Sequence, residues 1–425
     1  MWLICFSRMF FLLRDAREIL RRSYLKEMWI HNESVCQSSS VKVACTLLEG
    51  KEKEYVMRVC VWREIKKGII MKKVAIIGIQ GVPAKYGGFE SLVENIIGGN
   101  CSAEVSYTVF CSGMDMKERL VSYKGCELKY VPLLSANGAQ SVVYDIVSMC
   151  GALRGYDVLL VLGVSGCLFL PIVKLFSKSK VVVNIDGLEH RRKKWGSVAR
   201  CFLRLSEWMA VRWADVVVAD NKGIEEYVVE RYGKKPELIA YGGDHVMREV
   251  GVEREVEILS EYGVEKGKYA VSICRIEPEN NCHIILEAFA RCGRKLVFVG
   301  NWRKSHYGFA LREKYRECKN IIFVDALYDL DVLYVLRKNA GWYMHGHSAG
   351  GTNPSLVEAM FFGRPIIAYD VVYNRETTMG RAVYFKSASD ICRLLNEGID
   401  GSELRCIAER QYTWERIARQ YEGLY

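Results

Sequence analysis

The sequence predicts an α/β protein with two doubly wound domains, each built on a parallel sheet. Apolar runs alternate with helical patterns from Met71 onward, which is typical of βαβ units whose sheet is covered on both faces. The same alternation begins again near Tyr269, after a polar stretch over 242–267. The length of 425 residues suits two or three domains of roughly 100–200 residues each.

In the first series, short β-rich apolar runs predict the strands. These strands are Val74–Gly78, Tyr107–Cys111, Glu127–Val131, Val158–Leu162, Val181–Ile185, Val216–Ala219 and Leu238–Ala240. Helical patterns lie between them, among them Phe89–Ile97, Ser141–Arg154 and Ser197–Arg212.

The second series has the same form and predicts a second sheet. Its strands are Ala270–Ile273, Lys295–Val299, Ile321–Val324, Gly341–Met344 and Pro365–Ala368. Its helices include Cys282–Arg291, Leu330–Lys338, Pro354–Phe362 and Ser387–Glu397. The final string, Tyr412–Tyr421, fits an amphipathic helix with Trp414 as its packing anchor.

We therefore expect an N-terminal extension over 1–70, α/β domains over 71–245 and 246–410, and a C-terminal helix over 411–425. The apolar stretch Met1–Leu13 is shorter than the roughly 20 residues that span a bilayer. Our hypothesis is that Met71 is the true start and that 1–70 is a misassigned upstream reading frame. The rival reading is a real accessory segment that faces a membrane, and mass spectrometry of the native N-terminus would decide between them.

Charge and cysteine content restrict the classes of function. The net charge of +10 and a pI near 8.8 leave nucleic acid, an anionic membrane surface and phosphorylated substrates open. No aromatic platform is interleaved with the cations, which disfavours nucleic acid. No two of the 16 cysteines are spaced Cys-x-x-Cys, so a structural zinc site is disfavoured and a reducing, cytosolic compartment is expected.

Two first-domain strings could carry chemistry. Gly81–Glu90 follows the first strand and opens a helix, where Gly87 and Gly88 let a ligand approach the backbone and free N–H groups favour an anion. The string lacks Gly-x-Gly-x-x-Gly, which disfavours a dinucleotide dehydrogenase. The second string brings carboxylates, a histidine and cations to a strand end, at Asp186, Glu189, His190 and Arg191–Lys194. The alternatives are an ordinary strand–helix turn and a solvated charged loop.

Two second-domain strings are more specific. Arg275 follows a strand and precedes Glu279 and Asn280. Its planar guanidinium group can donate two hydrogen bonds to a diphosphate, and the alternative is an ion pair with Glu279. Tyr343–Met360 reads as a strand end, a Gly-rich loop and a helix, with Glu358 one turn inside that helix. Its candidate ligand residues are His345, His347, Gly350, Gly351, Thr352, the N-cap Asn353, and Ser355.

At these residues the chain resembles the group 1, retaining GT-B glycosyltransferases (family 4). Their pattern of Arg-x-x-Pro-Glu-Lys-Asn, Glu-x7-Glu, Leu-Glu-Ala-Met and Gly-x-Pro is similar to Arg275–Asn281, Glu358–Met360 and Gly363–Pro365. Gly81–Glu90 and Asp186–Glu189 resemble a subgroup with a DUF1972-type N-terminal domain. That subgroup is commonly assigned as rhamnosyltransferases of bacterial surface-polysaccharide synthesis. The resemblance covers 71–425.

Three positions depart from the broad pattern. Asn280 replaces a lysine, Gly350 replaces the first glutamate of Glu-x7-Glu, and Asp186 stands where a histidine is frequent. We interpret these changes as a change of donor sugar.

The resemblance implies a GT-B fold of two facing Rossmann-like domains, with a nucleotide-diphosphate sugar as substrate and neither a cofactor nor a metal. The implied catalytic residues are Asp186, Arg275 and Glu358. The implied donor-binding residues are Gly87, Gly88, Asn280, His345, His347, Gly350, Gly351, Thr352, Asn353 and Ser355. The implied acceptor-side residues are Glu90, Glu189, His190 and Lys194.

The expected function is transfer of rhamnose or a similar hexose to a lipid-linked glycan, by a cytoplasmic enzyme that can lie on the inner face of the plasma membrane. Polysaccharide assembly proteins are possible partners, and nucleic acid is not expected. A GT-B-like nucleotide-sugar epimerase stays open and would act without an acceptor. A non-catalytic scaffold also stays open because of Asn280 and Gly350, and would bind the nucleotide sugar without transferring it.

Overall fold

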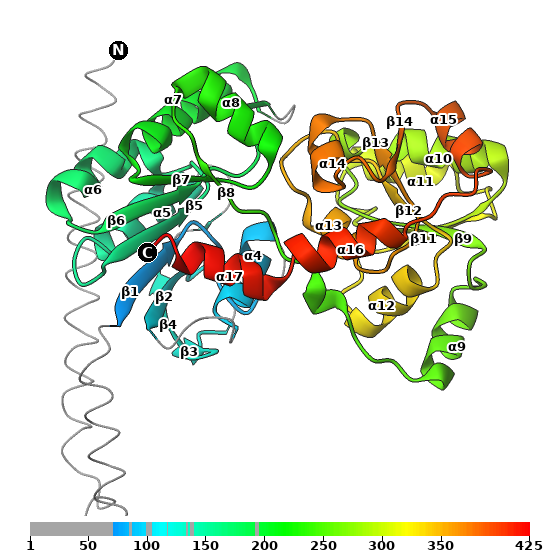
Figure 1. Cartoon of the computed structure of the whole chain (residues 1–425), viewed down its shortest axis with the longest axis horizontal. Coiled ribbons are helices and arrows are strands. Elements are labelled where there is room, and N and C mark those ends of the chain that lie inside the picture. The colour runs from blue at the N-terminus through cyan, green and yellow to red at the C-terminus, as the bar shows by residue number, and fades with distance from the viewer. Residues whose placement is uncertain are drawn as a thin grey trace, which may run out of the picture. The chain divides into compact units, whose positions relative to one another are not determined.

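The computed structural model describes residues 71–84, 87–98, 104–116, 118–132, 135–136, 140–191 and 195–425. The expectations for 1–70 and for Lys194 lie outside these residues. Lys72–Tyr425 forms one compact unit, in which two parallel-stranded sheets each carry helices on both faces (Figure 1). The predicted α/β fold class is confirmed.

The first sheet has the strand order β3-β4-β2-β1-β5-β6-β7-β8. All neighbours pair in parallel except β3 and β4, which are antiparallel. Its strands are β1 (Lys72–Ile77), β2 (Val105–Ser112), β3 (Ser122–Tyr123), β4 (Cys126–Val131), β5 (Val158–Leu162), β6 (Lys180–Asn184), β7 (Val216–Ala219) and β8 (Glu237–Leu238). Every residue of β5 is buried, as expected for a central strand covered on both faces.

The second sheet has the order β11-β10-β9-β12-β13-β14 and is parallel throughout. Its strands are β9 (Tyr269–Ile273), β10 (Lys295–Val299), β11 (Ile321–Val324), β12 (Trp342–His345), β13 (Ile366–Tyr369) and β14 (Val383–Phe385). Because β9 lies between β10 and β12, the chain reverses its direction of winding there. Ligands of open parallel sheets bind at such a point, beyond the carboxyl ends of the strands.

Helices close four hydrophobic cores, one on each face of each sheet. The first-domain helices are α4 (Gly88–Ile96), α5 (Gln140–Gly151), α6 (Leu170–Phe176), α7 (Ser197–Trp213) and α8 (Lys222–Tyr232). The others are α9 (Val252–Glu261), α10 (Cys282–Cys292), α11 (His306–Lys314), α12 (Leu330–Lys338), α13 (Pro354–Met360), α14 (Val372–Thr377), α15 (Ala388–Leu394), α16 (Ser402–Gln411) and α17 (Trp414–Glu422). No helix within the described ranges is long and apolar enough to cross a bilayer.

The last helix, α17, packs on the first sheet together with α4 (Figure 1). Its buried side chains Trp414, Ile417 and Tyr421 belong to the core of that face. Asn184 at the end of β6 donates a hydrogen bond to the Tyr421 hydroxyl at 2.7 Å. The chain therefore crosses between the domains twice, once after β8 and once between α16 and α17. The two crossing segments meet where Gly243 N–H donates to the Tyr412 carbonyl.

Candidate active site

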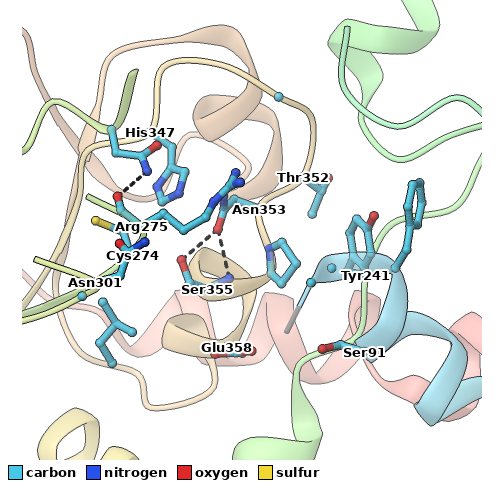
Figure 2. Close-up of a pocket in the computed structure, with 18 of the residues that line it drawn as sticks. Ser91, Tyr241, Cys274, Arg275, Asn301, His347, Thr352, Asn353, Ser355 and Glu358 are labelled. Carbon is cyan, nitrogen blue, oxygen red and sulfur yellow. Dashed lines mark hydrogen bonds between the residues drawn. The ribbon is translucent and has the colours of Figure 1, made fainter. Parts of the chain in front are cut away.

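A cavity of about 620 Å³ lies between the two sheets and is lined by residues of both domains. The second domain contributes the ends of β9, β10 and β12 and the start of α13, while the first contributes the start of α4 and the ends of β6 and β7. Arg275 and Glu358 face this one cavity, as does the loop from Ala349 to Ser355. Figure 2 shows Arg275 extending toward Asn353 and Ser355, with Tyr241 and Ser91 of the first domain on the opposite side.

The second-domain wall of the cavity has a net positive charge. Arg275, Lys304 and Arg337 line it together with two carboxylates, Glu279 and Glu358. The nearest carboxylate to Arg275 is Glu277, at 3.9 Å between Nη1 and Oε1, and both side chains are more than one-third exposed. Such a loose, hydrated pair contributes little energy, so the guanidinium can turn to an anionic ligand.

The Gly-rich loop supplies backbone donors beside these cations. Within the described chain, the amides of Gly350 and Gly351 have no hydrogen-bond acceptor. Gly350 has φ +108°, a conformation that strains any residue with a Cβ. A Cβ on Gly351 would lie 1.8 Å from the Asp220 carboxylate. Asn353 caps α13 by accepting a hydrogen bond from Ser355 N–H at 3.0 Å.

Two side chains contact Glu358: Arg337 of α12 and His245 of the segment that links the two domains. The buried Arg337 donates to its Oε2, and His245 Nε2 lies 3.6 Å from its Oε1. Trp414 Nε1–H donates to His245 Nδ1 at 2.9 Å, which places the proton of neutral His245 on Nε2, facing Glu358. Burial lowers the pKa of His245, with a smaller contribution from Arg337, so His245 is neutral near pH 7.

The first-domain wall of the cavity is acidic. Glu90, Asp186, Glu189 and Asp220 line it, and among described residues this domain adds no lysine or arginine there. Glu90 accepts a hydrogen bond from Gln80 N–H at 3.0 Å, and burial raises the pKa of its carboxyl. Gly87 is required beside it, because a Cβ there would lie 1.8 Å from Glu90 Oε2.

The two domains touch directly behind the cavity. Thr352 donates to the Asp220 carbonyl, and the Asn221 amide group donates to Thr352 Oγ1 at 3.3 Å. A Cβ on Gly187 would lie 2.6 Å from the Gly350 Cα. Glycine at these positions lets the acidic and cationic walls approach closely.

The structure assigns three of the expected site residues to other environments. His190 lies outside the cavity lining and is buried, with Nδ1 at 3.0 Å from Glu207 Oε2; this corrects its acceptor-side assignment. His345 is also buried beneath the lining and stacks on His347, with ring centroids 4.4 Å apart. Burial lowers the pKa of His345 to about 3, so it packs as a neutral ring.

The third is Asn280, which lines the cavity but uses its amide to hold the loop. Its Nδ2 donates to the Arg275 carbonyl at 2.7 Å. It therefore positions the backbone of Arg275 instead of offering a donor to the ligand.

The other predicted residues within the described chain line the cavity. They are Asp186, Arg275, Glu358, Gly87, Gly88, His347, Gly350, Gly351, Thr352, Asn353, Ser355, Glu90 and Glu189. Sequence reasoning missed Lys304, Arg337, Asp220 and Tyr241 of the lining, and His245 behind it. The available signal for Lys304 was the basic pair Arg303-Lys304 in the loop that follows β10. Within the described ranges, no three His, Cys, Asp or Glu side chains group in a way that could hold a metal ion.

Family models match both domains. Residues 71–244 match a domain of unknown function, DUF1972, and residues 257–402 match the glycosyl transferases group 1. No curated protein matches the chain.

Several solved structures share the fold at low sequence identity. Sucrose-phosphate synthase from Thermosynechococcus elongatus is 16% identical, over 83% of this chain and 98% of that chain, with a TM-score of 0.67. Anabaena HepE in complex with UDP-glucose is 15% identical over the same shares, with a TM-score of 0.67. The catalytic domain of Arabidopsis thaliana starch synthase IV, bound to ADP and acarbose, is 12% identical over 84% and 98%, with a TM-score of 0.61.

These findings agree with the site geometry, in which two doubly wound domains enclose a cavity with one cationic and one acidic wall. Rhamnosyl specificity, retention and membership of family 4 stay predictions. The chain thus carries a DUF1972 domain followed by a group 1 glycosyl transferase domain, on a fold that it shares with GT-B glycosyltransferases.

Proposed function

We propose that the chain transfers rhamnose or a similar hexose from a nucleotide-diphosphate donor to a hydroxyl of a lipid-linked glycan, at the inner face of the plasma membrane. The observation that carries this proposal is the division of charge across the cavity. Three cations and two carboxylates line one wall, whereas the other wall has four carboxylates and, among described residues, no lysine or arginine. Such a cavity orients a donor that has an anionic leaving group at one end and a sugar rich in hydroxyls at the other.

The diphosphate belongs on the second-domain wall. Arg275 can clamp it with two parallel N–H groups, and Lys304 supplies the second positive charge that the missing lysine at position 280 would have given. The amides of Gly350 and Gly351, which lack acceptors in the described chain, point to the same ligand. Stabilising the negative charge that develops on the leaving diphosphate provides most of the rate.

The nucleoside belongs deeper in the second domain. Glu358 accepts hydrogen bonds from ribose hydroxyls, while Arg337 and His245 fix its carboxylate. Ala326, Leu327 and Tyr328 also line the cavity and hold the base. Similar structures support this placement only by analogy: HepE has been solved in complex with UDP-glucose and starch synthase IV with ADP.

The sugar and the acceptor belong against the acidic wall. Asp186 and Glu90 can accept hydrogen bonds from sugar hydroxyls, and Glu189 lies on the acceptor side. In the proposed retaining step, the bond from the anomeric carbon to the phosphate oxygen breaks as the acceptor oxygen bonds to the same face. The acceptor proton passes to the leaving phosphate, and no metal takes part in this step.

Two assays test the proposal and its rivals. Thermal shift with dTDP-, UDP- and GDP-sugars should identify one donor by its rise in melting temperature, because a ligand that binds the folded state stabilises it. That donor is then incubated with a bacterial lipid extract, and transfer of its sugar to a lipid is followed by mass spectrometry. A changed sugar nucleotide in the absence of acceptor would identify an epimerase instead, and binding without transfer to any acceptor would identify a scaffold.

A further inference from the structure

Helix α7 presents an apolar stripe to solvent on the side opposite its buried face. Val198, Cys201, Leu205 and Trp208 are all exposed, with Val198 at 86%, Leu205 at 38% and Trp208 at 47%. Their spacing of three and four residues places them in one line along the helix. We call these four residues the α7 stripe. Leu203, Ala210 and Val211, on the other side, belong to the core of the first domain.

Four cations surround the C-terminal half of this stripe. Arg204 and Arg212 lie on α7, Arg231 lies on α8, and Lys234 follows α8. Among described residues, none of the four has a carboxylate within salt-bridge distance. Two nearby acids are engaged elsewhere, since Glu207 accepts from the Tyr232 hydroxyl at 2.6 Å and Asp215 pairs with Lys174 at 2.8 Å.

Between α7 and α8, three of these cations meet one end of the stripe in a groove of about 670 Å³. The groove is lined by Trp208, Val211, Arg212, Arg231, Tyr232 and Lys234. Lys234 Nζ donates to the carbonyls of Val211 and Ala214, at 3.0 and 2.7 Å, so its charge is fixed at the end of α7. Figure 1 shows α7 on the outer side of the first sheet with α8 next to it.

The exposed α7 stripe is edged by cations that have no carboxylate partner among described residues, and this combination fits an anionic membrane surface. Apolar side chains and tryptophan enter the boundary between headgroups and acyl chains, while arginines on long stems reach the phosphates. A second copy of the chain fits less well. A two-fold contact through this helix would set Arg204 and Arg212 against the same cations of the other copy, without acids to neutralise them.

We propose that the α7 stripe and the α7–α8 groove form the surface by which this protein binds anionic phospholipid bilayers. The proposal rests on the proposed function, which places the enzyme at a membrane, and names the surface that binds it; vesicle binding is measured without donor or acceptor, so its failure is distinguishable from a failure of sugar transfer.

The test is co-sedimentation of the full chain with vesicles of phosphatidylcholine, alone or with 30% phosphatidylglycerol. We expect strong preference for the anionic vesicles and loss of binding at high salt. Arg212→Gln with Arg231→Gln should weaken the partition about 25-fold, at roughly fivefold for each cation near the surface. Leu205→Ser with Trp208→Ser should weaken it at least about tenfold, from the apolar area lost.

Matched controls come from the second domain. Val252 and Val256 of α9 are 78% and 61% exposed but stand among glutamates, so Val252→Ser with Val256→Ser should leave vesicle binding unchanged. Arg393→Gln with Arg405→Gln removes two exposed arginines that pair with acids and should have little effect. Circular dichroism melting confirms that each variant is folded.

Three results would overturn the proposal. One is wild-type protein that does not bind anionic vesicles, and another is binding that the groove and stripe substitutions leave intact. The third is a wild-type protein that self-associates in analytical ultracentrifugation while Leu205→Ser with Trp208→Ser is monomeric and binds vesicles as before, which would make the stripe a contact between copies.

Discussion

The two walls of the cavity differ in the sign of their charge and in how their charged groups are held. The second-domain wall carries three cations and two carboxylates, which are Arg275, Lys304, Arg337, Glu279 and Glu358. The first-domain wall carries Glu90, Asp186, Glu189 and Asp220. A donor with a diphosphate at one end would be attracted by one wall and repelled by the other. We propose that charge sets the orientation of the donor before any hydroxyl contact forms and that hydrogen bonds then select the sugar.

The largest effect should come from the cationic wall at Arg275. Arg275→Ala should lower kcat by about 100-fold or more, as does the loss of one donor to a developing oxyanion. Steady-state transfer with the donor found by thermal shift measures it. Arg303→Ala is the matched control, because Arg303 pairs with Asp325 on the surface and does not line the cavity. Near-normal turnover of Arg275→Ala would remove Arg275 from the diphosphate.

The second test asks whether Lys304 replaces the lysine missing at position 280. Lys304→Ala should lower kcat/KM about 30-fold, the scale of one charge-assisted hydrogen bond, and Lys304→Arg should retain most activity. An unchanged kcat/KM in Lys304→Ala would leave Arg275 alone at the diphosphate.

A smaller effect is expected behind the cationic wall, at His245. His245→Phe removes the Nε2–H that faces Glu358 and should weaken nucleoside diphosphate binding by at most about fivefold, because a 3.6 Å contact is weaker than a neutral hydrogen bond. Isothermal titration calorimetry measures it, and Trp414→Phe should show part of the effect.

The same contact predicts a pH dependence with a definite sign. Burial lowers the pKa of His245 below its ordinary 6.5. Its neutral form therefore persists above pH 6.5, and affinity should be flat there. As the pH falls through the lowered pKa, a proton on Nδ1 opposes the Trp414 N–H, so the wild-type affinity should drop toward that of His245→Phe. An affinity that rises on acidification would contradict this arrangement.

The smallest effect is expected on the acidic wall. Asp186→Asn should strengthen binding of the nucleoside diphosphate two- to threefold, on the order expected when one like charge several ångströms away is removed in a hydrated site. It should also reduce transfer, because Asp186 faces the sugar. Asn tolerates the left-handed backbone at this position, where φ is +57°. Weaker nucleoside diphosphate binding would mean that Asp186 attracts the donor instead.

The sequence was sufficient for most of the fold because buried parallel strands are continuous apolar runs. The strands Val158–Leu162, Val216–Ala219, Lys295–Val299 and Ile321–Val324 have the predicted bounds. The edge strands β3 and β14 were missed because they have only two and three residues, too few to show a pattern.

Site residues that directly follow a strand could be predicted, because the carboxyl ends of parallel strands share one edge. Arg275 and the Gly-rich loop are of this kind. Arg337 was missed because it resembles a surface cation in the last turn of α12, and only tertiary packing buries it. His190 was assigned to the acceptor side from its neighbours in the sequence. Its partner Glu207 is 17 residues away on α7, so the local string does not reveal their pairing.

The most direct test of the charge division is a crystal structure with the nucleoside diphosphate that raises the melting temperature most. We expect the β-phosphate about 3 Å from the Arg275 guanidinium and from the Gly350 or Gly351 amide, with the ribose at Glu358. The terminal oxygens of the β-phosphate, to which the sugar is attached in the donor, should point toward Asp186. A diphosphate bound against Glu90 and Asp186, with Arg275 turned to solvent, would contradict the account.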